Sequence, residues 1–404
     1  DPFTGTGTFI TRLLQSGLIQ SKDLERKYKY EIHANEIVLL AYYIAAVNIE
    51  NAYHDATPTP DDGIGGGTYH PFEGIVLTDT FQLSETGEGN KMFSEMFPQN
   101  SERVAKQKKA PLRVIVGNPP YSVGQRSAND NAQNQKYTSL DSRIANTYAK
   151  GSKATSVKAL YDAYIKAFRW STDRLDPEHG GIIAFISNIG WLDGNSADGF
   201  RKTLEKEFTS IWVFNLRGNQ RTSGELSRKE GGKLFGGGSR TPIAITLLVK
   251  NPAAKNQKAV IHYHDIGDYL SREEKLDLIK KFGSIASPDM AWQTLSSDEH
   301  GDWLRQRNDV FDTFIPLAPE KKFSLKTQSF FNTYVVGVVT SRDTWVYNFS
   351  KKKLSANMTS MIEFYDTQRN LYHKAVSKNP KLEVETFIGA NPEQISWSRA
   401  LRAD

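Results

Sequence analysis

The pattern of hydrophobic and polar positions predicts strands and helices in alternation along the first part of the chain. Short apolar runs bounded by Gly, Pro or Asp are typical of buried strands, and apolar positions three or four apart are typical of amphipathic helices. Strands are predicted near residue 32 and within 74–78, 112–117, 180–192, 210–216 and 241–251. Helices are predicted at 8–19, 35–48, 156–175 and 197–208. This alternation predicts an α/β fold with a mainly parallel sheet.

The pattern changes after Asn251. One helix is predicted near 271–283 and another near 354–375, with irregular segments rich in Trp and Tyr between them. We therefore expect a first domain at 1–252 and the start of a second domain at 253–404. Pro, Gly and Asp at 54–74 predict a loop, and the polar stretch 122–155 predicts a mobile loop. Asp1-Pro2 leads directly into a glycine-rich turn, which a strand normally precedes, so we expect the first domain to be N-terminally incomplete.

Composition narrows the class of protein. The chain has no cysteine, which excludes disulfides and thiolate metal sites and is consistent with a reducing compartment. No apolar run is long enough to cross a bilayer, so we expect a cytoplasmic protein without a membrane partner. The net charge is only +5, but residues 101–150 hold nine basic and three acidic residues. That local excess favours a polyanionic partner, although a solvated basic loop would have the same composition.

A glycine turn marks the first candidate site. Gly5 and Gly7 form a G-x-G arrangement in "DPFTGTGTF", between a strand position and a helix. The third glycine of the dinucleotide fingerprint is replaced by Ile10, and no G-K-S/T follows, so neither a pyrophosphate nor a nucleoside triphosphate is favoured. An adenosine-containing ligand with a charged tail and no phosphate fits this turn better. A tight turn without a ligand remains the alternative.

Polar residues at the ends of successive predicted strands extend this site. Glu31 is predicted at the end of the strand near residue 32, where a carboxylate can accept hydrogen bonds from ribose hydroxyls. Asp79 follows the next strand and could accept a hydrogen bond from an adenine amino group. Asn118 ends the strand after that. Ligands of α/β sheets bind outside the carboxyl ends of the strands, so we expect these residues to share one site.

The tetrapeptide Asn118-Pro119-Pro120-Tyr121 predicts the chemistry. The amino nitrogen of an aromatic base is a weak nucleophile because its lone pair is delocalised into the ring. The Asn118 side-chain carbonyl and the Pro119 backbone carbonyl could hold its two N–H groups and localise the lone pair toward a methyl donor. Tyr121 could stack on the base. A base in a duplex would have to be flipped out to reach such a pocket.

Together the two motifs resemble the S-adenosylmethionine-dependent N6-adenine DNA methyltransferases of the gamma motif order. Three further stretches are similar to the methyltransferase portion of type ISP single-polypeptide restriction–modification enzymes, namely "EIHANEIVLLAYYIAAVNIE", "GGGSRTPIAITLLVKN" and "TSRDTWVYNFSKKKL". The resemblance implies a Rossmann-like methyltransferase domain with a mainly parallel sheet, followed by a mixed α/β target-recognition domain. It also implies S-adenosyl-L-methionine as cofactor, double-stranded DNA as partner, no metal, and nuclease and helicase modules on the same full-length polypeptide.

The resemblance also implies roles for individual residues. Asn118, Pro119, Pro120 and Tyr121 would be catalytic, and Tyr121 and Phe235 would stack on the flipped base. The cofactor-binding set would be Asp1, Phe3, Thr4, Gly5, Thr6, Gly7, Glu31, Ile32, Asp79, Thr80 and Asn118. Of these, the glycine turn would hold the methionine part, Glu31 the ribose and Asp79 the adenine.

Other functions stay open at this point. The same tetrapeptide occurs in enzymes that methylate a protein glutamine amide or a guanine of ribosomal RNA. The chain could also be a DNA-binding specificity module without activity of its own. An N4-cytosine target is chemically possible, although serine would then be expected in place of Asn118.

Overall fold

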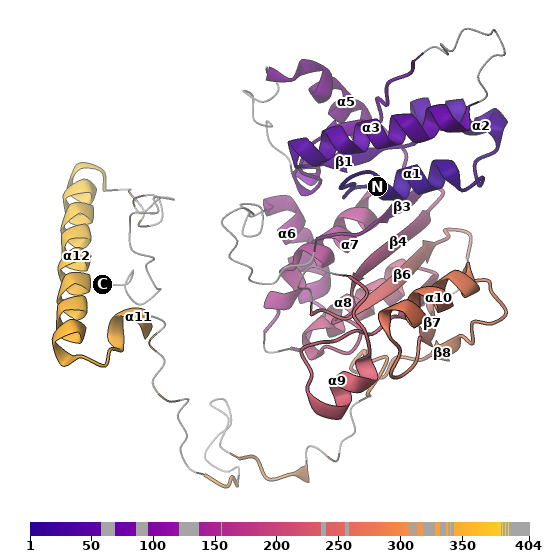
Figure 1. Cartoon of the computed structure of the whole chain (residues 1–404). Coiled ribbons are helices and arrows are strands. Elements are labelled where there is room, and N and C mark those ends of the chain that lie inside the picture. Colours follow the sequence, from indigo (N-terminus) through magenta and orange to yellow (C-terminus); the bar gives the residue numbers. More distant parts are fainter. Residues whose placement is uncertain are drawn as a thin grey trace. The chain divides into compact units, whose positions relative to one another are not determined.

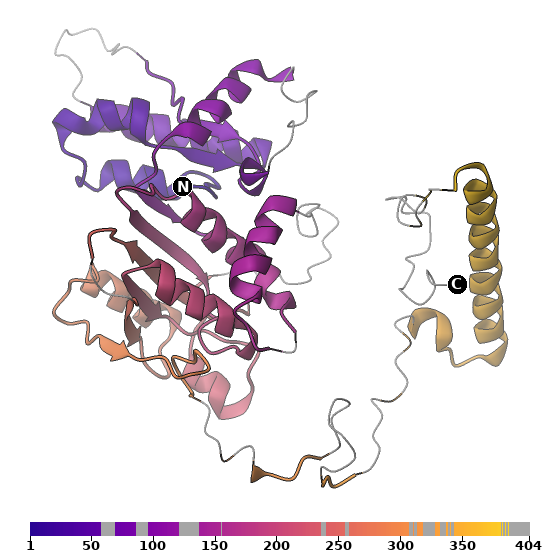
Figure 2. The ribbon, with the colours of Figure 1, turned by 180° about the vertical axis from the view of Figure 1, so that it is seen from behind.

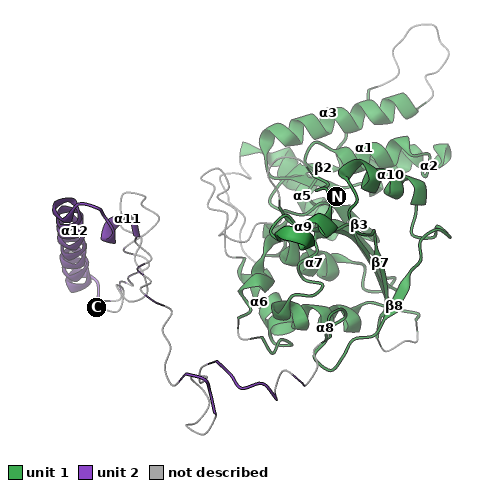
Figure 3. Ribbon diagram, turned by 60° about the horizontal axis from the view of Figure 1, so that its bottom comes forward, with its two compact units in different colours: residues 1–308 green, residues 309–404 purple. Residues whose placement is uncertain are grey.

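The computed structural model divides the chain into two compact units, Asp1–Asn308 and Asp309–Asp404 (Figure 3). It describes residues 1–57, 69–85, 96–120, 137–154, 156–235, 240–254 and 258–306 of the first unit. In the second unit it describes 343–380 and short pieces at 310, 313–317, 328–331, 337, 340, 382, 384 and 387.

The described residues of the first unit form two sheets. Strands β1 (Ala34–Glu36) and β2 (Ile75–Leu77) pair in parallel. The larger sheet has the order β3-β4-β6-β5-β7-β8 (Figure 1), with β3 at Val114–Gly117, β4 at Gly181–Asn188, β5 at Ser210–Asn215, β6 at Ile243–Lys250, β7 at Val260–Asp265 and β8 at Gln293–Leu295. Strands β3, β4, β5 and β7 run in one direction, while β6 and β8 are antiparallel to their neighbours. The predicted α/β class is confirmed, in a sheet of mixed direction.

Helices cover both faces of the larger sheet. The α-helices of the first unit are α1 (Thr8–Gln15), α2 (Ser21–Arg26), α3 (Leu39–Ala56), α5 (Pro98–Lys109), α6 (Thr138–Ile144), α7 (Ala163–Arg174), α8 (Asp198–Glu207), α9 (Gly224–Glu230) and α10 (Arg272–Phe282). Helices α7 and α8 lie across the face seen in Figure 2, and α10 lies on the opposite face (Figure 1). This layering follows from strands that are apolar on both sides.

The main core lies between α7, α8 and the sheet. Phe168 of α7 packs edge-on against Phe185 of β4, with ring centroids 5.2 Å apart, and it also contacts Phe200 of α8 at 5.5 Å. Trp191, 1% exposed, packs against Phe200 and against Trp303 near the end of the unit. Edge-to-face aromatic pairs of this kind each add roughly 0.5–1.5 kcal/mol beyond their burial.

The segment after residue 252 continues the same unit. Strands β7 and β8 extend the sheet, and the buried Arg201 donates to Asp302 at 2.6 Å and to the Gly301 carbonyl at 2.7 Å. The compact unit therefore runs to Asn308. The boundary after residue 252 concerns a division of function and stays a prediction.

A second core supports β1 and β2. Tyr28, fully buried, stacks on Tyr53 of α3 with ring centroids 3.7 Å apart, and Ile32 belongs to the same cluster. The sequence predicts a short strand ending near Ile32, but residues Lys27–Glu31 form a π-helical turn and the strand begins only at Ala34. This prediction is wrong because stacking on α3 buries Tyr28 in a helical backbone.

The predicted mobile loop at 122–155 is wrong over part of its length. Residues 121–136 lie outside the described residues, but α6 follows them and continues into a π-helical turn at Ala145–Ala149. Leu140, Ile144 and Tyr148 are 1% exposed or less. Their four-residue spacing is a helical signal that the surrounding polar residues hide.

The second unit is helical where it is described. It contains α11 (Asp343–Val346) and the long helix α12 (Lys351–Lys378). Ser350 caps α12 by accepting a hydrogen bond from the Lys353 N–H at 3.3 Å. None of the residues of α12 is buried. Across the part of the chain that the structure describes, no helix has the length and apolar character needed to cross a bilayer.

Candidate functional site

A cavity of about 310 Å³ opens at the carboxyl ends of β1, β2 and β3. Glu36 is the last residue of β1, Asp79 follows β2 and Asn118 follows β3. The lining residues are Pro2, Phe3, Gly5, Asn35, Glu36, Ile37, Thr78, Asp79, Thr80, Phe81, Asn118, Pro120, Tyr137, Tyr161, Ala163 and Lys166. The position of the cavity follows the general rule for ligand sites in α/β folds.

The two glycines of the turn have different surroundings. Gly7 has a φ of +88° and precedes α1, and a Cβ there would lie 3.2 Å from Ile49 and 3.3 Å from Ala45. Gly7 therefore lets the turn pack closely on α3. Gly5 has a φ of +55° and nothing within 4 Å of a Cβ position, and it lines the cavity. Gly5 leaves open space that a ligand can occupy.

Glu36 connects the turn to β1. Its Oε2 accepts a hydrogen bond from the Gly5 N–H at 2.7 Å, and its Oε1 accepts one from the Val38 N–H at 2.8 Å. The side chain is held with 9% of the residue exposed. A carboxylate fixed in this way, at a strand end inside the cavity, has free lone pairs for two neighbouring hydroxyls.

The structure does not bring Glu31 to this cavity. Glu31 ends the π-helical turn, where its carboxylate pairs with Arg26 and with Lys27 at 2.6 Å, and its side chain is 37% exposed. Glu36 occupies the place that the sequence interpretation gave to Glu31. The signal that was missed is the short segment "ANE" directly before the apolar start of α3, an acid between a strand and a helix.

Asp79 and Thr80 both line the cavity just after β2. Asp79 Oδ1 accepts a hydrogen bond from the Phe81 N–H at 2.9 Å, and its Oδ2 accepts one from the Tyr137 hydroxyl at 2.7 Å. Thr80 accepts a hydrogen bond from the Asn35 side chain at 3.2 Å and donates to the Pro2 carbonyl. These bonds tie the end of β2 to the end of β1 and to the glycine turn.

Asn118 presents an unused acceptor. Its Oδ1 is buried and has no hydrogen-bond partner among the residues that the structure describes, and Asn118 and Pro120 both line the cavity. A buried carbonyl without a donor costs roughly 1–3 kcal/mol, so such groups are usually paired in the functional state. Pro119 is buried beside Asn118 and does not line the cavity. Two prolines remove two backbone donors and restrict the backbone around the amide.

The remaining predicted residues support the site or lie apart from it. Asp1 Oδ1 accepts from the Phe3 N–H at 3.0 Å and lies where a Cβ on Gly117 would be 2.9 Å away. Phe3 lines the cavity and packs on Phe81. The residues that do not line it are Asp1, Thr4, Thr6, Gly7, Glu31, Ile32, Pro119 and Phe235. Phe235 is 39% exposed, and Tyr121 lies outside the described residues.

One wall of the cavity was not predicted. Tyr137 contributes to it from just before α6, Tyr161 from the 3-10 turn before α7, and Lys166 from the first turn of α7. Lys166 Nζ lies 2.8 Å from Asp141 Oδ1 and 4.9 Å from the centroid of the Tyr137 ring. Burial, followed by the hydrogen bond to Asp79, raises the pKa of the Tyr137 hydroxyl, which therefore stays a donor near neutral pH.

Among the described residues, no group of three or more His, Asp or Glu side chains could hold a metal ion. The basic residues of the segment 101–150 lie in different surroundings. Lys106, Lys108 and Lys109 are exposed near the end of α5, whereas Arg143 pairs with Asp173 at 2.7 Å. Arg126 and Lys136 lie outside the described residues.

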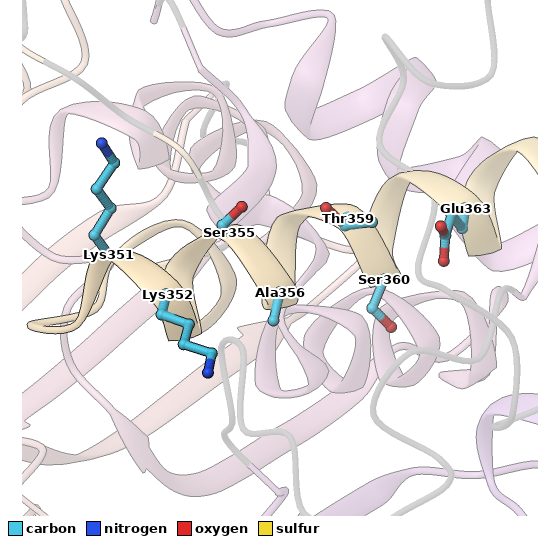
Figure 4. Close-up of a pocket in the computed structure, with 7 residues that line it drawn as sticks. All are labelled: Lys351, Lys352, Ser355, Ala356, Thr359, Ser360 and Glu363. Atoms are coloured by element: carbon cyan, nitrogen blue, oxygen red, sulfur yellow. The ribbon is translucent and has the colours of Figure 1, made fainter.

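A surface hollow follows the first turns of α12 (Figure 4). Lys351, Ser355 and Thr359 form one row at four-residue spacing, and Lys352, Ala356 and Ser360 form a second. Glu363 lies at the far end. Basic and hydroxyl groups on a single exposed helix offer donors to an extended polyanion rather than a closed pocket for a small ligand.

The fold and the position of the cavity are those of a Rossmann-like domain, and family comparisons specify the class of protein. Residues 33–221 match the Eco57I restriction-modification methylase family, and residues 329–404 match the Type ISP C-terminal specificity domain. The chain therefore contains a region similar to restriction-modification methylases, followed by a region similar to the Type ISP specificity domain. A comparison with curated proteins finds no match.

Solved structures agree with this assignment. The chain is 44% identical, with a TM-score of 0.79, to a nuclease-deletion mutant of the Type ISP restriction-modification enzyme LlaGI in complex with a DNA substrate mimic. It is 39% identical, also at 0.79, to the ATP-dependent Type ISP enzyme LlaBIII bound to DNA, and 35% identical, at 0.75, to DrdV in a DNA complex. These matches cover 100%, 100% and 91% of this chain but only 32%, 25% and 34% of the other chains.

Proposed function

We propose that the chain transfers a methyl group from S-adenosyl-L-methionine to N6 of an adenine flipped out of double-stranded DNA, within a restriction–modification system. The observation that carries this proposal is the buried Oδ1 of Asn118, which has no hydrogen-bond partner among the described residues and lies in the cavity at the ends of β1, β2 and β3. A methylase domain followed by a specificity domain gives such a reaction its DNA context.

The lining residues fit the proposed cofactor. Gly5 leaves space beside the turn, and Glu36 offers a fixed carboxylate for the two hydroxyls of a ribose. Asp79 offers a second carboxylate for the amino group of a purine, and Phe3 and Ile37 add apolar surface. S-adenosyl-L-methionine, when bound, supplies an electrophilic methyl group. It has no phosphate, which agrees with the absence of a phosphate-binding glycine motif.

Asn118 and Pro119 perform the catalytic positioning in this proposal. The Asn118 Oδ1 accepts one N–H of the flipped amino group, and the Pro119 carbonyl accepts the other. Two acceptors outside the plane of the base localise the nitrogen lone pair, and their rigidity means that little reorganisation is needed as positive charge develops on nitrogen. The proton then leaves through these acceptors or to solvent, so no strongly basic side chain is needed. Tyr121 is proposed to stack on the base.

DNA recognition is assigned to the second unit and to the basic surface of the first. The lysines of α5 and of α12 are exposed and can neutralise phosphates. The part of the chain that recognises the DNA sequence is proposed to begin after residue 252. Because the chain covers only 32% and 25% of the two Type ISP structures, the intact protein is proposed to carry nuclease and ATP-driven motor modules as well.

The test is to identify the product. The protein is incubated with isotopically labelled S-adenosyl-L-methionine and unmethylated DNA, and the digested nucleosides are analysed by mass spectrometry. Label in N6-methyldeoxyadenosine supports the proposal. Label in N4-methyldeoxycytidine would replace adenine by cytosine as target, and label in RNA or protein but not in DNA would overturn the proposed function.

A further inference from the structure

We propose that Tyr137 and Lys166 are positioning residues that orient the Asp79 carboxylate to recognise a purine amino group, and so make the site selective for an adenine-containing cofactor. This inference rests on the proposed function, because it concerns how the same cavity distinguishes the base of its ligand. Neither residue lies at a strand end, and the sequence assigned neither of them a role.

Two hydrogen-bond donors hold the Asp79 carboxylate. One oxygen accepts from the Phe81 N–H at 2.9 Å and the other from the Tyr137 hydroxyl at 2.7 Å. The first bond fixes the carboxylate to its own turn, and the second fixes its rotation about the Cβ–Cγ bond. A carboxylate held by two donors remains an acceptor for a third, because each oxygen has a second lone pair.

Tyr137 is itself held by its neighbours. Its ring lies edge-on to Phe81, with centroids 5.3 Å apart, and the Lys166 ammonium lies 4.9 Å from its centroid. Asp141 fixes Lys166 through an ion pair of 2.8 Å and also accepts from the Tyr137 N–H at 3.3 Å. Tyr137 is 2% exposed and Lys166 8% exposed, so water screens these interactions little.

A carboxylate fixed in this way distinguishes purines by the group at position 6. An ionised carboxylate can only accept hydrogen bonds, so it pairs with an amino group and repels a carbonyl oxygen at the same position. A purine with a 6-amino group is therefore favoured over one with a 6-oxo group. Loss of the Tyr137 hydroxyl would let the carboxylate rotate and would weaken the contact that only the amino group makes.

The main experiment measures base discrimination in binding. Dissociation constants of S-adenosylhomocysteine and of its 6-oxo counterpart S-inosylhomocysteine are measured by calorimetry for the intact protein and for Tyr137→Phe. We expect the unmodified protein to bind the amino compound more tightly than the oxo compound. In Tyr137→Phe the ratio of the two dissociation constants should fall about tenfold, with little change in the affinity for the oxo compound. Tyr148→Phe is the matched control, since Tyr148 is equally buried in the same core but does not line the cavity.

A second variant pair tests the cation. Lys166→Met should reduce the discrimination by a few-fold, and Lys166→Arg should restore most of it, because a guanidinium can also lie over the Tyr137 ring and pair with Asp141. A purely structural role would lower thermal stability and weaken both compounds equally. Thermal melting of each variant shows whether folding is preserved.

The outcomes separate the two proposals. If the protein binds neither compound, the proposed function itself fails. If it binds both but Tyr137→Phe leaves their ratio unchanged, or weakens both by the same factor, the positioning role is wrong while the proposed function stands.

Discussion

The cavity of the first unit and the α12 surface of the second hold different polar groups in opposite settings. In the cavity, Glu36 and Asp79 are each held by two hydrogen bonds, and the Asn118 acceptor is buried. On α12, Lys351, Lys352 and the neighbouring hydroxyls are exposed (Figure 4). The cavity can therefore select one small ligand by geometry. The α12 surface can attract a long polyanion but relies on charge, which salt weakens.

The largest effect is expected at the centre of the cavity. In the proposed function, Asn118→Ala removes one of the two acceptors for the target amino group, and preorganised groups of this kind typically contribute roughly 10²- to 10³-fold to turnover. We expect methyl transfer to fall by about that factor while DNA affinity is retained. Single-turnover assays and DNA-binding titrations measure the two quantities. Unchanged methyl transfer in Asn118→Ala would remove the chemical role from the cavity.

Two acids that lie five residues apart provide a sharper test of the cavity. Glu36→Gln removes the charge that accepts from the Gly5 N–H, and we expect about a tenfold loss of affinity for S-adenosylhomocysteine. Glu31→Gln should leave that affinity unchanged, since Glu31 only pairs with Arg26 and Lys27 outside the cavity. Calorimetric titration of both variants decides the point, and the reverse result would restore Glu31 to the site.

Charge on α12 should affect DNA and not the cofactor. Replacing Lys351 and Lys352 with alanine is expected to weaken DNA binding several-fold and to lower the slope of log affinity against log salt by about two. The paired control is Lys374→Ala with Lys378→Ala, near the other end of the same helix. Titrations at several salt concentrations provide the measurement. Equal losses in both pairs would mean that the hollow in Figure 4 has no special role.

The smallest expected effect contrasts a buried lysine with these exposed ones. Lys275 is fully buried and donates to the Glu230 and Gly232 carbonyls at 2.8 Å, and burial lowers its pKa to about 8. Its folded pKa lies below the unfolded value, so the unfolded state binds more protons between about pH 8 and the normal lysine pKa. Stability should therefore rise with pH across this window, relative to Lys275→Met. Denaturation curves give the free energy of unfolding of the protein and of Lys275→Met at about pH 7.5 and about pH 9.5. If Lys275 titrates normally, the difference between the two proteins will be the same at both pH values.

Part of the cavity lining could be predicted from short stretches of sequence. Gly5, Asp79 and Asn118 were predicted because each lies where an apolar strand gives way to a turn, and all three line the cavity. The Glu31 prediction was wrong because a two-residue alternation of aromatic side chains has the appearance of a strand, while stacking of Tyr28 on Tyr53 holds that segment in a helical turn. The contact that decides the local backbone comes from a helix more than twenty residues away.

The sequence by itself determined the α/β class, most of its strands and helices, and the two motifs on which the proposed chemistry rests, since these depend on short-range patterns of burial and turn formation. Only the tertiary structure decided that Glu36 takes the place expected for Glu31 and that Tyr137 and Lys166 form a wall of the cavity. Those residues come together through packing of α6 and α7 beside the end of β2. Such packing depends on the shape of the whole core, which short-range patterns do not encode.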